Sequence, residues 1–262
     1  VGETREFVEQ SGLPVFSTPM GKTSVDESYE NKQFGGVYIG SLSHDDVKEV
    51  IEEKSDLVIA IGTLLSDFNT GSFTYRTKRE TTIELHSDRT MIGFGTYEGV
   101  RMKHLIPKIT DTLKKDKDKR LQQTESLLKA CRASFNNDLP KPDAELATLS
   151  KDLIHELGGE QKVVKEVITQ AHLWPRIGQF LRAGDKVIGE TGTSSFGLME
   201  VRFPQKAQFI SQVLWGSIGY ALPATLGVAL GARQLAKEGK EVSGGMSVPG
   251  GRAILFIGDG SL

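Results

Sequence analysis

Short apolar runs recur along most of the chain and alternate with stretches of helical periodicity. Runs of this length, bounded by glycine, proline or polar residues, predict β-strands. They occupy residues 13–18, 34–40, 56–62, 82–86, 186–190, 209–212 and 254–257. Apolar residues spaced three and four apart predict helices with one buried face. These helices occupy residues 3–11, 43–51, 102–113, 173–181 and 216–232. Strands that alternate with helices favour parallel sheets and an α/β fold.

A polar stretch divides this pattern into two halves. Residues 136–142 are rich in asparagine and proline, and the polar composition continues to about residue 165, which is typical of a linker. We therefore expect two Rossmann-like parallel-sheet domains, at residues 1–135 and 166–262, joined by a linker at 136–165. In the first domain, Ser43 is the predicted N-cap of a helix. Residues 56–62 are the clearest buried strand of this half.

The composition narrows the classes of partner and compartment. The net charge of −2 over 262 residues argues against nucleic acid or an anionic membrane surface. No apolar run is long enough to span a bilayer. The single cysteine, Cys131, excludes an internal disulfide and fits a reducing compartment, so we expect a cytoplasmic protein. We expect it to pack in a helix with Leu128. The first residues lack an initiator methionine and a signal-peptide pattern, so we expect a piece of a longer protein.

Two glycine-rich segments imitate nucleotide-binding motifs without completing them. Residues 21–23 (Gly-Lys-Thr) end like a phosphate-binding P-loop, but Phe16 stands where the pattern needs its first glycine. Residues 93–99 carry three glycines, of which the third falls one residue late for a dinucleotide fingerprint. Neither segment predicts a bound nucleotide.

Four polar residues of the first half have roles that the pattern leaves open. His44 and His86 have no second histidine or cysteine at metal-ligand spacing, so we expect structural or solvent-exposed roles. Asp67 and Asn69 follow the strand at residues 56–62 in a polar, turn-rich segment. Turn capping is the expected role for both. A contact with an effector or at an interface is the alternative.

The strand at residues 254–257 leads into Gly258-Asp259-Gly260-Ser261. Open α/β sheets bind ligands at the carboxyl ends of their strands. Glycines there let the backbone approach a phosphate and expose its N–H groups. The carboxylate of Asp259 is a hard oxygen ligand that suits Mg²⁺. Taken alone, the motif is weak, and an ordinary strand-end turn is the favoured interpretation.

Two upstream segments change the interpretation of this motif. Residues 190–196 (Glu-Thr-Gly-Thr-Ser-Ser-Phe) and 211–219 (Ser-Gln-Val-Leu-Trp-Gly-Ser-Ile-Gly) precede it in order. Together the three segments resemble the diphosphate-binding domain of thiamine-diphosphate-dependent 2-oxo acid decarboxylases, among them the fungal pyruvate decarboxylases. Residues 65–75 resemble the middle domain of that family. The resemblance covers nearly the whole chain, as most of a middle domain followed by a truncated diphosphate-binding domain.

The resemblance implies a role for residues of each segment. Asp259 would bind Mg²⁺, Gly216 would accept a hydrogen bond from the aminopyrimidine through its carbonyl, and Ile218 would hold the cofactor bent. The alternative for Ile218 is a core position on a helix. The alternative for Thr191 and Thr193, which would line the cofactor site, is local turn hydrogen bonding. We assign no role to Glu190. The residues expected to bind the cofactor are Thr191, Thr193, Gly216, Ser217, Ile218, Gly258, Gly260 and Ser261.

The activity that the resemblance implies is that of a carboxy-lyase. Such an enzyme converts a 2-oxo acid, here pyruvate, to an aldehyde and CO₂, using thiamine diphosphate as the electron sink and Mg²⁺. It is expected to be a dimer or tetramer. The family's activating glutamate and acid–base groups lie in segments outside this sequence, so we expect the 262-residue piece alone to be inactive.

Two alternatives to this activity remain open, and a third is disfavoured. An indolepyruvate or phenylpyruvate decarboxylase would use the same chemistry on a larger substrate. A non-catalytic paralogue would bind thiamine diphosphate and regulate transcription. A plain Rossmann-like binding module does not account for three cofactor motifs in the correct order.

Overall fold

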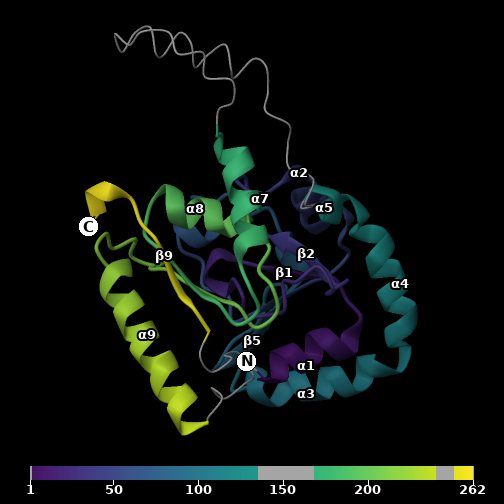
Figure 1. The fold of residues 1–262 in the computed structure, drawn as a ribbon. Helices are drawn as coiled ribbons and strands as arrows, with labels where there is room; N and C mark the ends of the chain where they lie inside the picture. Colours follow the sequence, from purple (N-terminus) through teal and green to yellow (C-terminus); the bar gives the residue numbers. More distant parts are fainter. Residues whose placement is uncertain (1, 135–167, 240–250, 262) are drawn as a thin grey trace, which may run out of the picture.

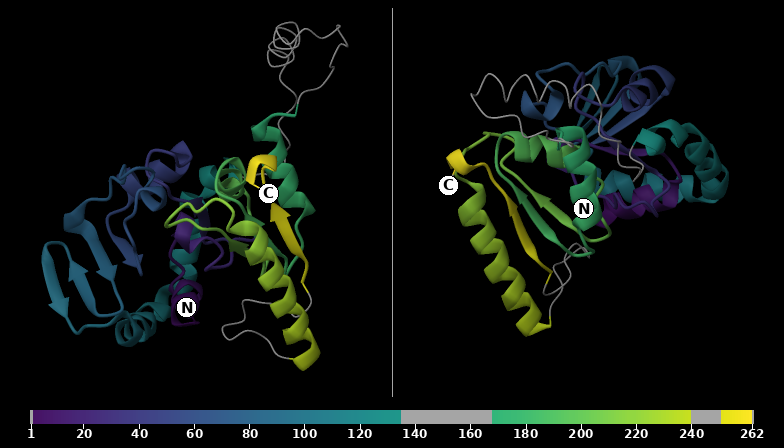
Figure 2. Two further views of the ribbon diagram at one scale, coloured as in Figure 1. Left: turned by 90° about the vertical axis from the view of Figure 1, so that its left-hand side faces the viewer. Right: turned by 45° about the horizontal axis from the view of Figure 1, so that its top comes forward.

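The computed structural model describes residues 2–134, 168–239 and 251–261 of the chain. Within them, two groups of strands and helices lie side by side, and both are α/β arrangements with parallel strands (Figures 1 and 2). The first group spans residues 2–134 and the second spans residues 168–261. The expected linker at 136–165 lies outside the described residues. The α/β fold expected from the strand–helix alternation is confirmed in each group.

The first group contains two separate sheets and five α-helices. The helices are α1 (Gly2–Ser11), α2 (Asp45–Lys48), α3 (Met102–Leu113), α4 (Lys117–Leu127) and α5 (Lys129–Ser134). The strands are β1 (Val15–Ser17), β2 (Phe34–Val37), β3 (Val58–Ile61), β4 (Thr82–Leu85), β5 (Arg89–Ile92) and β6 (Gly95–Glu98). A π-helical segment, η2 (Glu49–Lys54), continues α2.

The strands of the first group are only partly parallel. β1 pairs with β2 in parallel, and β3 pairs with β4 in parallel. In contrast, β4–β5 and β5–β6 are antiparallel, in a sheet of order β3-β4-β5-β6. The reason lies in the connections. Gly93 (φ 57°) and Phe94 form a two-residue hairpin loop, and a parallel crossover needs a dozen residues or more. The expectation of an all-parallel first domain is therefore wrong for its last two strands.

Helices cover one face of the four-stranded sheet. Phe7 of α1 and Ile106 of α3 pack against Leu85 of β4, with Ile59 and Ile83 beside them. β3 is an end strand of this sheet and all four of its residues are only half-buried. The expectation of a fully buried strand at residues 56–62 is therefore wrong in degree.

A second cluster surrounds the helix of residues 45–54. Val47, Val50 and Ile51 form its buried face, as expected, and they pack with Leu128 and Cys131. Ser43 is not the N-cap, because the helix begins at Asp45 and the cap position belongs to His44. The Ser43 hydroxyl instead accepts a hydrogen bond from the Ile39 N–H (2.6 Å) and closes the preceding turn.

The second group is a parallel sheet of order β8-β7-β9 with three described helices. The strands are β7 (Lys186–Gly189), β8 (Gln208–Ile210) and β9 (Ala253–Phe256). The helices are α7 (Gln170–Phe180), α8 (Thr193–Glu200) and α9 (Ala221–Glu238). The central strand β7 is buried along its length, and its core includes Trp174, Leu198 and Phe203. The parallel sheet expected for this half is confirmed.

Two expected boundaries in the second group are wrong. The helix expected at residues 216–232 begins only at Ala221, because Gly216 (φ 55°) and Gly219 (φ 90°) adopt a backbone conformation that a right-handed helix does not contain. The polar loop expected at residues 191–195 ends earlier, because α8 already begins at Thr193, directly after Gly192 (φ 125°).

A buried junction joins the two groups. Lys22 forms an ion pair with Glu27 (2.7 Å) and donates to the Val201 carbonyl (2.9 Å). Arg202 reaches back from the second group and donates to the Glu27 carbonyl (2.9 Å). The hydroxyl of Thr23 accepts from the Phe209 N–H (3.0 Å). The P-loop-like segment at residues 21–23 is therefore a structural element of this junction.

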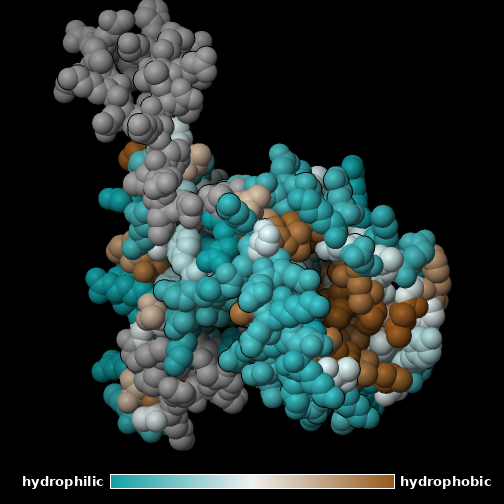
Figure 3. All heavy atoms as spheres, turned by 90° about the vertical axis from the view of Figure 1, so that its right-hand side faces the viewer, coloured by the Kyte–Doolittle hydropathy of each residue, from teal (hydrophilic) through white to brown (hydrophobic). Residues whose placement is uncertain are grey.

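The surface carries both polar and apolar areas (Figure 3). Figure 3 shows a broad apolar area on the face of the molecule that carries α4. None of the helices in the described part of the chain combines the length and apolarity needed to cross a bilayer.

Candidate functional site

The carboxyl ends of β7 and β9 lie side by side. Gly189 at the end of β7 pairs with Phe256 at the end of β9. The next N–H, that of Glu190, donates to the Phe256 carbonyl (2.9 Å). Because the strands are parallel neighbours, the loop with Thr191 and the Gly258–Ser261 segment leave the sheet at the same edge, where α/β sheets bind ligands.

The third predicted segment reaches the same edge. A Cβ atom added to Gly216 would lie 3.6 Å from Thr191 Cγ2 and 3.3 Å from Phe68 Cε2. The turn at residues 216–220 therefore lies against the Thr191 loop. The structure thus brings the segments that carry the predicted cofactor residues to one edge of one sheet. We call this edge the carboxyl edge.

The predicted residues differ in exposure at this edge. Thr191 is half-buried, whereas Thr193 is exposed in the first turn of α8. Ile218 is 69% exposed and lies before α9, so the alternative that it is a core residue on a helix is wrong. Gly216 and Ser261 are half-buried. Ser217, Gly258, Asp259 and Gly260 are exposed as well.

The backbone at the end of β9 is open to an approaching group. A Cβ atom added to Gly258 or Gly260 would meet nothing within 4 Å. Asp259 and Ser261 lie in a single 3₁₀ turn (Asp259–Ser261), in which Asp259 Oδ1 accepts from the Gly260 N–H (3.0 Å). Such an open, glycine-flanked backbone fits a diphosphate.

The metal-binding potential of this edge depends on Asp259. Its carboxylate is exposed at the carboxyl edge. The described part of the chain contains no group of three or more histidine, cysteine, aspartate or glutamate side chains that could hold an ion. Mg²⁺ is commonly held by one or two carboxylates together with phosphate oxygens and waters. A single carboxylate beside an open backbone therefore fits a shared Mg²⁺–diphosphate site.

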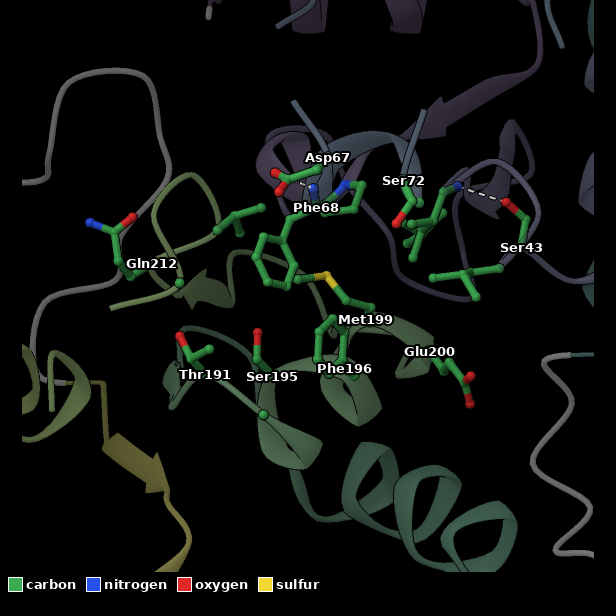
Figure 4. A pocket seen from close by; sticks show the side chains of 18 of the residues that line it. Ser43, Asp67, Phe68, Ser72, Thr191, Ser195, Phe196, Met199, Glu200 and Gln212 are labelled. Atoms are coloured by element: carbon green, nitrogen blue, oxygen red, sulfur yellow. Dashed lines mark hydrogen bonds between the residues drawn. The ribbon is translucent and has the colours of Figure 1, made fainter. Parts of the chain in front are cut away.

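A cavity of about 470 Å³ lies between the two groups and adjoins this edge. Thr191 and Gly216 line it from the second group, and Phe68 lines it from the first. Figure 4 shows the rings of Phe68 and Phe196 turned toward the same space, and their centroids lie 6.0 Å apart. The cavity is mainly apolar, with a few polar groups at its rim, a composition typical of small-molecule sites. The sequence analysis included Phe196 and Phe68 only within the segments at residues 190–196 and 65–75, and it assigned neither ring a role.

Asp67 and Asn69 hold the segment that presents Phe68. Asn69 is 1% exposed, accepts from the Met20 N–H (2.9 Å) and donates to the Leu64 carbonyl (2.7 Å). Asp67 Oδ1 accepts from the Phe68 N–H (2.8 Å). The expected turn-capping role is therefore confirmed for both residues.

The two histidines have different surroundings. His44 lies at the N-terminal end of α2 and lines the cavity, a position that the sequence pattern did not indicate. His86 Nε2 lies 3.1 Å from Glu84 Oε2 at the end of β4, in keeping with the expected structural role.

Glu190 is the polar residue of the carboxyl edge that sequence reasoning left without a role. Its side chain is buried, with the residue 2% exposed. Its Oε1 accepts from the Thr191 N–H (2.8 Å). Its Oε2 accepts from the N–H groups of Gly219 (3.1 Å) and Ala221 (3.2 Å). The position of this glutamate directly before the threonine loop was a visible signal. Its partners Gly219 and Ala221, however, lie about 30 residues further along the chain.

Comparison with known proteins identifies similar sequences. The family described as thiamine pyrophosphate enzyme, central domain, matches residues 1–111. Pyruvate decarboxylase of Candida albicans is 42% identical over 261 residues, that of Kluyveromyces lactis 40% over 260, and isozyme 1 of Saccharomyces cerevisiae 38% over 260. Each alignment covers 99% of this chain and 39% of the relative's length. The chain therefore spans about two fifths of these relatives.

Proposed function

Since residues 1–111 match the family described as thiamine pyrophosphate enzyme, central domain, we propose that the whole protein is a thiamine-diphosphate- and Mg²⁺-dependent decarboxylase of 2-oxo acids. It would act as a carboxy-lyase that converts pyruvate to an aldehyde and CO₂. The observation that carries the proposal is the convergence of the three cofactor segments at the carboxyl edge. Three pyruvate decarboxylases that align with 99% of the chain, at 38–42% identity, support it.

The diphosphate end of the cofactor is assigned to the end of β9. Asp259 would bind Mg²⁺, and Gly258, Gly260 and Ser261 would contact the diphosphate. The open space around both glycines supports this assignment. Thr191 and Thr193 would line the same site from the start of α8. Their hydroxyls follow the neighbouring strand, β7.

The reactive end of the cofactor is assigned to the turn at residues 216–220. Bound thiamine diphosphate supplies an electron sink for the carbanion left by decarboxylation. The carbonyl of Gly216 would orient the aminopyrimidine, with Ser217 beside it. The exposed Ile218 would press against the cofactor and keep it bent. The 69% exposure of this apolar side chain supports a contact with a group outside the described chain.

The cavity is assigned to the substrate. Its position beside Thr191 and Gly216 supports this, because a 2-oxo acid must reach the cofactor from a neighbouring space. Phe68 and Phe196 would exclude water from the reacting carbon. A volume of about 470 Å³ also admits side chains larger than that of pyruvate. Indolepyruvate and phenylpyruvate are therefore alternative substrates within the same proposal.

We further propose a homo-oligomer, a dimer or tetramer, in the cytoplasm. The exposure of the predicted cofactor residues supports a further surface that covers the carboxyl edge. The single cysteine of the chain, which is free and buried, supports a reducing compartment.

Substitution of Asp259 tests the proposal. In the full-length protein, Asp259→Ala should abolish Mg²⁺-dependent binding of thiamine diphosphate, because it removes the exposed carboxylate at the end of β9, a charged hard ligand. Isothermal titration calorimetry with and without Mg²⁺ measures the effect. Asp111→Ala, at an exposed aspartate of α3, is the matched control and should bind as the wild type does.

Undiminished binding by Asp259→Ala would remove the metal assignment. A wild-type protein that binds the cofactor with Mg²⁺ but releases no CO₂ from any 2-oxo acid would favour the alternative of a non-catalytic regulator.

A further inference from the structure

Glu190 lies where the three cofactor segments meet. Its own backbone follows β7, and its N–H donates to the last residue of β9, Phe256 (2.9 Å). Its carboxylate accepts from the first N–H of the threonine loop, that of Thr191. The same carboxylate also accepts from Gly219 and Ala221, at the end of the turn that carries Gly216 and Ile218. One buried residue therefore joins the end of β9 through its backbone N–H to the threonine loop and the turn at residues 216–220 through its carboxylate.

The turn at residues 216–220 needs such an anchor. Gly216 and Gly219 adopt positive φ angles, and α9 begins only at Ala221. The N-cap residue of α9, Tyr220, provides no side-chain hydrogen bond. The first N–H groups of a helix require an acceptor from elsewhere. Glu190 supplies that acceptor across about 30 residues of sequence.

The number of hydrogen bonds to the Glu190 carboxylate argues for a fixed position of the turn at residues 216–220 relative to the threonine loop. A buried carboxylate is expensive unless it is hydrogen-bonded, and Glu190 accepts three backbone N–H groups from two segments. These donors belong to the backbone, so they cannot turn away as side chains do. Any shift of the turn relative to the threonine loop would break at least one of these bonds.

We propose that Glu190 is a positioning residue that sets the turn at residues 216–220, and with it Gly216 and Ile218, against the threonine loop for the bound cofactor. This inference deepens the proposed function and rests on it. Glu190 acts through the backbone of the turn and does not itself touch the reacting atoms.

The test uses Glu190→Gln in the full-length protein. Glutamine keeps the size of the side chain but replaces one acceptor oxygen with a donating amide, so the N–H of Thr191 or those of Gly219 and Ala221 lose their acceptor. Hydrogen exchange followed by mass spectrometry should show faster exchange in the peptide containing residues 216–221. At saturating cofactor, kcat should fall by about ten- to a hundredfold, since a misplacement of about 1 Å has this effect, with little change in KM.

Two further measurements separate positioning from mere stability. Glu238→Gln, at the exposed last residue of α9, is the matched control and should leave exchange and kcat unchanged. If Glu190→Gln does not fold, the wild-type protein still decides the question. Its Gly219 and Ala221 amides should be protected from exchange without cofactor, although Gly219 is exposed.

The outcomes are distinguishable. Either of two results would overturn the positioning role. One is that Glu190→Gln keeps the wild-type hydrogen exchange and the wild-type kcat. The other is that the Gly219 and Ala221 amides of the wild-type protein are not protected from exchange. Failure of the wild-type protein to bind thiamine diphosphate would overturn the proposed function instead. In that case the exchange measurement would still show whether Glu190 holds the turn.

Discussion

At the scale of single residues, glycines with positive φ shape the carboxyl edge. Gly192 (φ 125°), Gly216 (φ 55°) and Gly219 (φ 90°) lie in the two loops that follow β7 and β8. Residues with a Cβ atom are strained in these conformations. Gly192 therefore closes a short turn before α8, and Gly216 and Gly219 delay the start of α9 to Ala221.

Ile218 lies in one of these turns and allows a residue-scale prediction. Because it is 69% exposed, Ile218→Ala should change the free energy of unfolding by no more than about 0.5 kcal/mol. Cofactor affinity should weaken by about 1–3 kcal/mol at most, through lost apolar contact. At saturating cofactor, kcat should fall about a hundredfold, because the bent cofactor geometry is lost. Ile218→Leu, which is still bulky, should keep more of the rate.

Kinetics and calorimetry on the full-length protein measure these effects separately. Phe94→Ala is a matched control, because Phe94 is an exposed apolar residue (73%) in the β5–β6 hairpin loop. It should leave kcat unchanged. Wild-type kcat in both Ile218 variants would show that Ile218 has no part in the reaction.

Cys131 illustrates a residue with a purely structural role. It is fully buried, and its thiol donates to the Asp46 carbonyl (3.3 Å). Burial raises the pKa of this thiol to about 11, so it stays protonated and unreactive at neutral pH. The packing role expected from the helical pattern is confirmed.

At the scale of elements, the loop after η1 (Pro19–Gly21) joins the two groups. Lys22 and Glu27 form a buried ion pair within it, and both contact the second group through Val201 and Arg202. Burial lowers the pKa of Lys22, and the neighbouring Glu27 opposes this shift. The cavity has one wall from each group. The junction therefore holds the wall from the first group in a fixed position against α8 of the second group.

Breaking this ion pair should be costly. Lys22→Met should lower the free energy of unfolding by about 3–5 kcal/mol, because it leaves the Glu27 carboxylate buried without its cation. Urea denaturation measures the change. The double variant Lys22→Met/Glu27→Met should recover part of the loss, since no unpaired charge remains.

An exposed ion pair provides the control for this experiment. Asp111→Asn breaks the surface pair between Asp111 and Lys114 and should cost at most about 0.5 kcal/mol. If Lys22→Met were as mild as Asp111→Asn, the junction would not depend on its buried charges.

At the scale of the whole molecule, the carboxyl edge is an open surface. Its predicted cofactor residues are mostly exposed, and the chain spans 39% of the length of its relatives. Decarboxylation through a carbanion requires a site from which water is excluded. An open edge does not provide one, although the cavity beside it is apolar.

We therefore expect the purified 262-residue chain to lack decarboxylase activity. Incubated with pyruvate, thiamine diphosphate and Mg²⁺, it should produce no more acetaldehyde than a sample without protein. A coupled dehydrogenase assay measures the aldehyde, with the full-length protein as the positive control. Aldehyde production by the 262-residue chain would contradict both this expectation and the assignment of the missing groups to other segments.

Local sequence patterns predicted the elements that depend on near neighbours. The buried face of Val47, Val50 and Ile51, the strands β7 and β9 and the helix α3 follow from apolar spacing within a few residues. The order of the cofactor segments predicted that they would lie at strand ends. Parallel pairing of β7 and β9 then brings two of them together.

Only the tertiary structure decided the contacts between distant residues. Three such contacts join residues 29 to 179 positions apart. They are the hydrogen bond from Gly219 to Glu190, the stacking of Phe68 on Phe196, and the hydrogen bond from Lys22 to the Val201 carbonyl. The antiparallel turn of β5 and β6 and the late start of α9 depend on glycine conformations that apolar spacing does not record. The physical reason is that apolar periodicity indicates which face of a helix or strand is buried, whereas the packing of the whole chain determines which residues that face contacts.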